Sequence, residues 1–177
     1  MTKQIARALV LTGLLSGLAA AALESAFSFE LAQLNAPLSF GWRFVRTPHP
    51  QGGKEIIGIM HTAEMTKSDS DFAGIWLRCA EKPFEVLIIL VRPLPPAAKA
   101  EVTLSGPSTG RFAATVLPPG TSVLLPDAAA QLFKGPLRGA SAVSISINSG
   151  TDHVKGEISL AGLGEALDRL ATACISR

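Results

Sequence analysis

Two neighbouring segments decide the fold: FAGIWLRC, residues 72–79, and FEVLIILV, residues 84–91. The first alternates in hydrophobicity, and this places Ile75, Leu77 and Cys79 on one face of a strand. The second is almost continuously apolar, which is typical of a central strand that is covered on both faces. Because only a tight, proline-containing connection separates them, the two segments predict a hairpin within a β-rich domain.

Shorter strands are predicted on both sides of this hairpin. They are separated by turns rich in glycine, proline and serine, and no linker or internal repeat divides the chain after residue 39. The predicted elements are strands at 40–45, 55–62, 100–104, 111–116, 121–125, 143–147 and 154–160, a short helix at 126–133, and a terminal helix from residue 162. This spacing predicts a mainly β fold in one domain, residues 40–177. We expect an antiparallel sandwich or partly open barrel, with a short helix and a C-terminal helix.

Residues 1–22 are typical of a cleaved secretory signal peptide. Two basic residues precede a short apolar run that ends in small residues. Ala20 and Ala22 satisfy the small-x-small rule and predict cleavage after Ala22. A membrane anchor is the weaker alternative, because the run is shorter than the roughly 20 apolar residues of a spanning helix. Residues 23–39 are predicted to be a poorly ordered lead-in.

The charge of the predicted mature chain is balanced. The full chain has 16 basic and 14 acidic residues, and two of the basic residues lie in the signal peptide. Nucleic-acid binding requires basic residues clustered on one face or element, whereas these are scattered singly. We therefore expect a periplasmic or secreted protein that binds no nucleic acid and keeps no stable membrane span after cleavage.

Cys79 and Cys174 are the only cysteines. An oxidising compartment favours a disulfide between them. Strand alternation points Cys79 inward, and Cys174 continues a helical stripe formed by Leu163, Leu167 and Leu170. Both sulfur atoms are thus expected to face one core, with two separate buried thiols as the alternative. A redox function is disfavoured because no Cys-x-x-Cys pair occurs.

One pattern imitates a serine hydrolase. Residues 106–110 match Gly-x-Ser-x-Gly around Ser108, and Asp127 and His153 follow in the usual order. That motif requires a sharp turn from strand into helix, whereas residues 111–116 have the pattern of a strand. A hairpin turn therefore explains the motif better, and a small envelope hydrolase using Ser108 and His153 is kept as the alternative function.

The sequence predicts neither a metal site nor a cofactor. His49, His61 and His153 are far apart in the chain and form none of the close pairs typical of zinc sites. Asp69-Ser70-Asp71 resembles the opening of a calcium loop but lacks the later ligands and the glycine.

Trp42 and Trp76 are the candidate binding residues. Large aromatic side chains recur at interaction hot spots and can form a platform for a ligand. In a chain with no tyrosine and eight phenylalanines, packing in the core is the more common role for such residues.

A family resemblance rests on two short motifs. Residues 72–79 resemble the small–apolar–x–Leu–Arg–Cys strand of small exported proteobacterial proteins, and residues 158–167 with Ala173-Cys174 resemble their final strand and helix. The chain is thus similar to the type VI secretion-associated VasI-like family and, more loosely, to the invasion-associated locus B proteins. It departs from the first at residues 175–177, where the family's tryptophan is absent. The resemblance implies a non-enzymatic periplasmic protein with a Cys79–Cys174 bridge.

These inferences converge on an exported, non-catalytic binding or accessory protein of the cell envelope. Its expected partner is another envelope protein or a small ligand. A self-associating structural component of the envelope is a further alternative.

Overall fold

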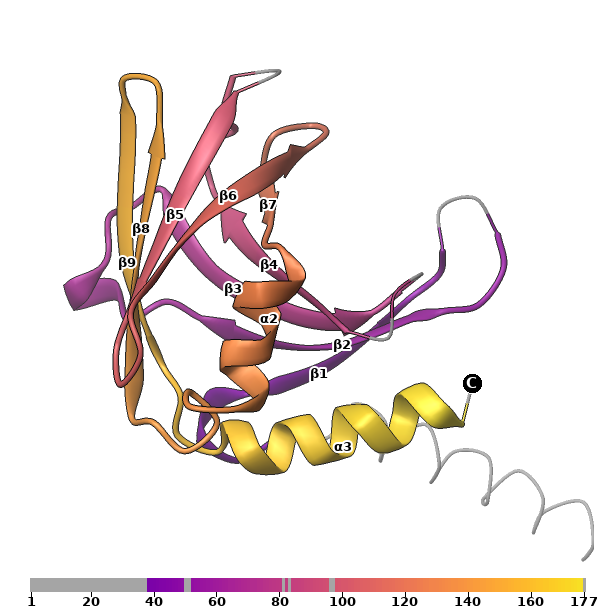
Figure 1. The fold of residues 1–177 in the computed structure, drawn as a ribbon. Helices are drawn as coiled ribbons and strands as arrows, with labels where there is room; N and C mark the ends of the chain where they lie inside the picture. Colours follow the sequence, from indigo (N-terminus) through magenta and orange to yellow (C-terminus); the bar gives the residue numbers. More distant parts are fainter. Residues whose placement is uncertain (1–37, 50–51, 81, 83, 96–97, 177) are drawn as a thin grey trace, which may run out of the picture. The chain divides into compact units, whose positions relative to one another are not determined.

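A single antiparallel sheet forms the framework of the part of the chain that the computed structural model describes, residues 38–49, 52–80, 82, 84–95 and 98–176 (Figure 1). Its strands are β1 (Arg43–Thr47), β2 (Ile56–Thr62), β3 (Phe72–Cys79), β4 (Glu85–Leu90), β5 (Lys99–Ser105), β6 (Gly110–Leu117), β7 (Ser122–Leu124), β8 (Ala142–Ser149) and β9 (Asp152–Ser159). Their spatial order is β1-β2-β3-β4-β7-β6-β5-β8-β9. The predicted mainly β fold is confirmed.

The central hairpin is also as predicted. β3 and β4 pair in antiparallel register, with Trp76 opposite Leu87, and β4 lies between β3 and β7 in the interior of the sheet. The first strand, in contrast, starts three residues later than expected. In place of extended chain, Ser39–Gly41 form the short turn η1, within which Phe40 and Gly41 have left-handed φ angles of 60° and 86°.

One edge of the sheet is covered by the connection between β2 and β3. The backbone N–H groups of Glu64 and Asp69 donate to the carbonyl oxygens of Glu157 and Lys155 on β9, each at 2.9 Å. In return, the Lys155 N–H donates to the Asp69 carboxylate at 2.7 Å, and the Glu157 N–H donates to the Ser68 hydroxyl at 3.0 Å. These bonds hold β9 beside β2 and β3 without strand pairing, so the sheet is a partly open barrel.

Two helices close the inner side of this curved sheet (Figure 1). Helix α2 (Asp127–Lys134) packs against β4 and buries Phe133 completely. Helix α3 (Leu163–Ile175) packs against β2 and β3 through the predicted apolar stripe. No helix in the described part of the chain is long and apolar enough to cross a membrane.

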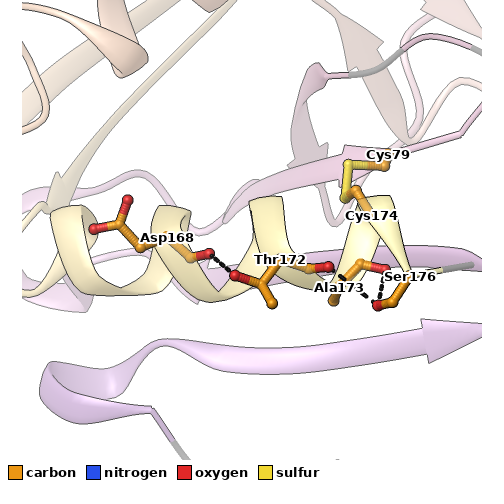
Figure 2. Close-up of a disulfide and its surroundings, with 6 residues drawn as sticks. All are labelled: Cys79, Asp168, Thr172, Ala173, Cys174 and Ser176. Carbon is orange, nitrogen blue, oxygen red and sulfur yellow. Dashed lines mark hydrogen bonds between the residues drawn. A yellow bond between two sulfur atoms is a disulfide. The ribbon is translucent and has the colours of Figure 1, made fainter.

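A disulfide fastens α3 to the sheet. Cys79 ends β3 and Cys174 lies in the last turn of α3, with 6.1 Å between their Cα atoms and 95 residues between them in the chain. Figure 2 shows that hydroxyl groups order the same turn: Thr172 donates to the Asp168 carbonyl at 3.0 Å and Ser176 donates to the Thr172 carbonyl at 3.1 Å. The predicted bridge is confirmed, and the alternative of two separate thiols is wrong.

The folded unit includes the last residues of the predicted lead-in. Leu38 is buried, and its N–H donates to the Trp42 carbonyl at 3.0 Å. The Trp42 indole N–H in turn donates to the Ala161 carbonyl at 2.9 Å, which fixes the entry of the chain to the loop before α3. Residues 1–37, including the predicted cleavage residues Ala20 and Ala22, lie outside the described residues.

Candidate binding site on the outer face of the sheet

The outer face of the sheet is divided into an apolar half and a polar half. Side chains of directly paired residues point to the same face, so the register assigns each residue to one side. On β5, β6, β8 and β9, most outward residues are polar or charged, among them Thr103, Arg111, Ser146 and Lys155. On β1–β4 and β7, larger apolar side chains point outward among polar ones, namely Val45, Ile56, Met60, Trp76, Leu87, Ile89 and Leu124; we call these seven residues the apolar outer face.

Neither α2 nor α3 packs over the apolar outer face, since both lie on the inner side. The expectation that β4 is covered on both faces holds at Leu87, which points outward and is 1% exposed, and fails at Ile89, which points outward and is half-buried. Of its seven residues, Ile56 and Leu87 are buried and the other five are half-buried, so the face presents a partly exposed apolar surface that a partner or ligand could cover.

A pocket of about 290 Å³ opens in this face where β2 ends and β3 begins. Its lining is largely apolar and includes Arg43, Val45, Met60, Thr62, Gly74 and Ile89. None of these six residues was predicted as a site residue.

Gly74 creates the pocket. It is paired with Thr62 on one side and with Ile89 on the other, so the middle position of this row has no side chain. The register shifts between Phe72 and Gly74, which marks a β-bulge, and Gly74 has a φ of 154°. A Cβ atom at this position would collide with the carbonyl oxygen of His61. The close approach of the two backbones therefore requires glycine.

Arg43 supplies a cation at the rim of the pocket. Its side chain is exposed, and it makes no hydrogen bond or ion pair with the residues that the structure describes. The other arginine of β1 differs in this respect, because Arg46 pairs with Glu55 at 3.5 Å. Arg43 is therefore available to an anionic group that approaches the apolar outer face.

His61 lines the same pocket but is fully engaged. Its Nδ1 and Nε2 atoms lie 2.8 Å and 3.0 Å from the carbonyl oxygens of Thr62 and Phe40, and its ring packs edge-on against Trp42. Both ring nitrogens are thus directed at backbone carbonyl oxygens, and the histidine holds the η1 turn against β2.

The two candidate tryptophans have different environments. Trp42 is 0% exposed and belongs to the core, which is the more common role that the sequence indicates for it. Trp76 is half-buried on the apolar outer face, where its ring lies over Gly58. The Arg78 guanidinium stacks 5.0 Å from the Trp76 ring centroid and pairs with Glu85 at 2.8 Å. These contacts hold Trp76 flat against the sheet.

The hydrolase candidates are not brought together. Ser108 lies in the turn after β5, level with the Ser105–Ser144 pair, whereas His153 lies at the level of Glu101. Four residues of extended chain, about 13 Å, separate these levels, and the two turns stand at opposite ends of the strands (Figure 1). Asp127 starts α2 and pairs with Lys82 at 3.3 Å.

Because of this separation, we expect Ser108→Ala to leave every measurable property of the protein unchanged. The free energy of unfolding should move by less than about 0.5 kcal/mol, as for a half-buried turn residue outside the core. A fluorophosphonate probe should not label the wild-type protein. Labelling that disappears in Ser108→Ala would restore the hydrolase hypothesis.

The remaining polar candidates are paired within the protein. Asp71 forms an ion pair with Arg92 at 2.9 Å, and the Asp69 carboxylate accepts the backbone bond from β9 described above. Within the described residues, no three His, Cys, Asp or Glu side chains gather as metal ligands would.

A second cavity of about 290 Å³ lies on the polar half, between Lys67, Ser144, Lys155 and Glu157. The pKa of Lys67 is raised, mainly because its side chain donates a hydrogen bond to Glu157. The attraction between the two charges is the second cause. Because the folded-state pKa is raised, the pair is fully formed below the ordinary lysine pKa and is lost only as pH rises through the folded value. Lys67 therefore stays protonated at physiological pH, and the carboxylate of Glu157 balances its charge.

Comparisons of the chain with protein-family models, with curated proteins and with solved structures find no match. The resemblance to the VasI-like family stays a prediction.

Proposed function

We propose that this protein is exported to the periplasm or secreted, and that it acts there as a non-catalytic binding or accessory protein of the cell envelope. The observation that carries the proposal is the apolar outer face, which neither α2 nor α3 covers and which contains a pocket. Burying such a surface against a partner is favourable, because it removes apolar area from water.

Two further observations support export. The Cys79–Cys174 disulfide is of the kind that persists in oxidising compartments. Residues 1–22 have the basic start, apolar run and small-residue end of a secretory signal.

Photo-crosslinking in intact cells tests the binding face. We expect a photoreactive amino acid at Thr62, which is exposed on the apolar half beside the pocket, to form a discrete adduct. The matched control is Ser144, which is exposed on the polar half of the same outer side. Val45→Glu, which places a charge on the apolar outer face, should remove the Thr62 adduct.

The adduct identifies the class of partner. An adduct of twice the mass of the chain would indicate the self-associating alternative, and a heavier unequal adduct would indicate another envelope protein. Adducts of equal yield at Thr62 and Ser144, or none at either, would contradict a binding role for the apolar outer face.

A further inference from the structure

We propose that the pocket beside Gly74 binds one linear acyl chain of about ten carbons, with the anionic group at its end held by Arg43. The proposal rests on the proposed function, because it assigns a ligand class to the same apolar outer face. It follows from the chemistry of the lining, from the position of Arg43 and from the volume of the pocket.

The lining selects an apolar ligand. Val45, Met60 and Ile89 present only aliphatic or thioether groups, and Gly74 presents none. Both ring nitrogens of His61 are already occupied by carbonyl oxygens. A sugar or nucleotide placed here would lose hydrogen bonds to water and find few replacements, which is unfavourable. A hydrocarbon chain loses nothing of this kind and gains from leaving water.

Arg43 selects the charge of the ligand. It stands at the start of β1 and lines the pocket. It has no ion-pair partner among the described residues. The residues that line the pocket include no acidic side chain. A carboxylate or phosphate that approaches the rim therefore meets an available guanidinium, which matches the geometry of such groups. The head group is expected on the β1 side of the pocket and the chain toward Ile89 on β4.

The volume sets the length of the chain. A methylene group occupies about the volume share of one liquid water molecule, roughly 30 Å³. The pocket of about 290 Å³ is partly open to solvent, and a chain of about ten such groups is of the size expected to occupy it. Each methylene that becomes buried should tighten binding by about fourfold, and a longer chain would leave its remainder outside the pocket.

Calorimetric titration of the purified chain with straight-chain carboxylates of six to fourteen carbons, below their micelle concentrations, tests the proposal. The affinity should rise by about fourfold per methylene up to about ten carbons and then level off. An affinity that does not depend on chain length, or no binding of decanoate, would overturn the proposal.

Variants separate the head group from the chain. Arg43→Gln should weaken decanoate binding at least tenfold and leave the binding of the neutral analogue decanol nearly unchanged. Arg169→Gln, the same substitution at an exposed position of α3, is the control and should affect neither ligand. Ala73→Leu, which adds bulk to the pocket lining, should weaken both ligands, with its thermal unfolding checked against wild type. Equal binding of decanoate by wild type and Arg43→Gln would exclude the assigned role of Arg43.

Cosedimentation with lipid vesicles distinguishes two sources of the chain. Decanoate binding without cosedimentation would indicate a free fatty acid. Cosedimentation with phosphatidylglycerol vesicles that Arg43→Gln and Ala73→Leu both reduce would indicate an acyl chain of an anionic lipid. The two proposals also fail separately: a specific Thr62 adduct together with no decanoate binding would overturn the acyl-chain inference alone.

Discussion

Removal of the disulfide is expected to lower the free energy of unfolding by about 4–5 kcal/mol, because it releases a loop of 95 residues in the unfolded chain. Cys79→Ala and Cys174→Ala should each cause this loss, which urea unfolding followed by circular dichroism would measure. The double variant should lose no more than either single variant, since all three remove the same covalent link.

Reduction of the wild-type protein is the matched control for the cysteine variants, because it opens the link without changing any side chain. It should reproduce the loss seen in the double variant. Clearly unequal losses in the two single variants would show that packing around each sulfur, more than the link, determines the effect.

Gly74→Ala is expected to destabilise the protein by about 3 kcal/mol, because strained backbone and overpacking each cost about 1–3 kcal/mol. The new methyl group would meet the His61 carbonyl oxygen, and the φ of 154° is one that side chains rarely adopt. Thermal unfolding would measure this as a fall of about 10 °C in Tm.

Gly53→Ala separates the two causes of this loss. Gly53 also has a positive φ, 107°, but a Cβ atom there would meet nothing within 4 Å. This variant should therefore show only the cost of backbone strain. If both alanine variants lost the same stability, the contact between Gly74 and His61 would have no energetic role.

The strands and the bridge could be predicted because their causes are local. Alternation within residues 72–79 determines which face Cys79 shares with Leu77, and the helical stripe that ends at Cys174 needs no knowledge of the rest of the fold. The late start of β1 could not be predicted, because the turn at Phe40 and Gly41 depends on a residue that is distant in the sequence. Nε2 of His61 lies 3.0 Å from the Phe40 carbonyl oxygen.

The pocket could not be predicted, because it depends on pairing between strands that are distant in the sequence. Gly74 within a strand is a recognisable sign of a bulge, but only the register shows that it lies between Thr62 and Ile89. Trp76 was a candidate from its residue type alone. Whether the face it occupies is covered depends on where α2 and α3 pack, and both pack on the other side.

The connection that lies along β9 has a consequence for assembly. Sheets that join through two free edges can add molecules without limit, and natural proteins protect such edges. In this protein, Ser68 and Asp69 already accept hydrogen bonds from the outer backbone N–H groups of β9. In the described part of the chain, β1 is therefore the one edge strand left to pair with a further strand. Edge-to-edge pairing of this protein would therefore stop at two molecules, and the positive charge of Arg43 on each β1 strand, unpaired among the described residues, would oppose even that pairing.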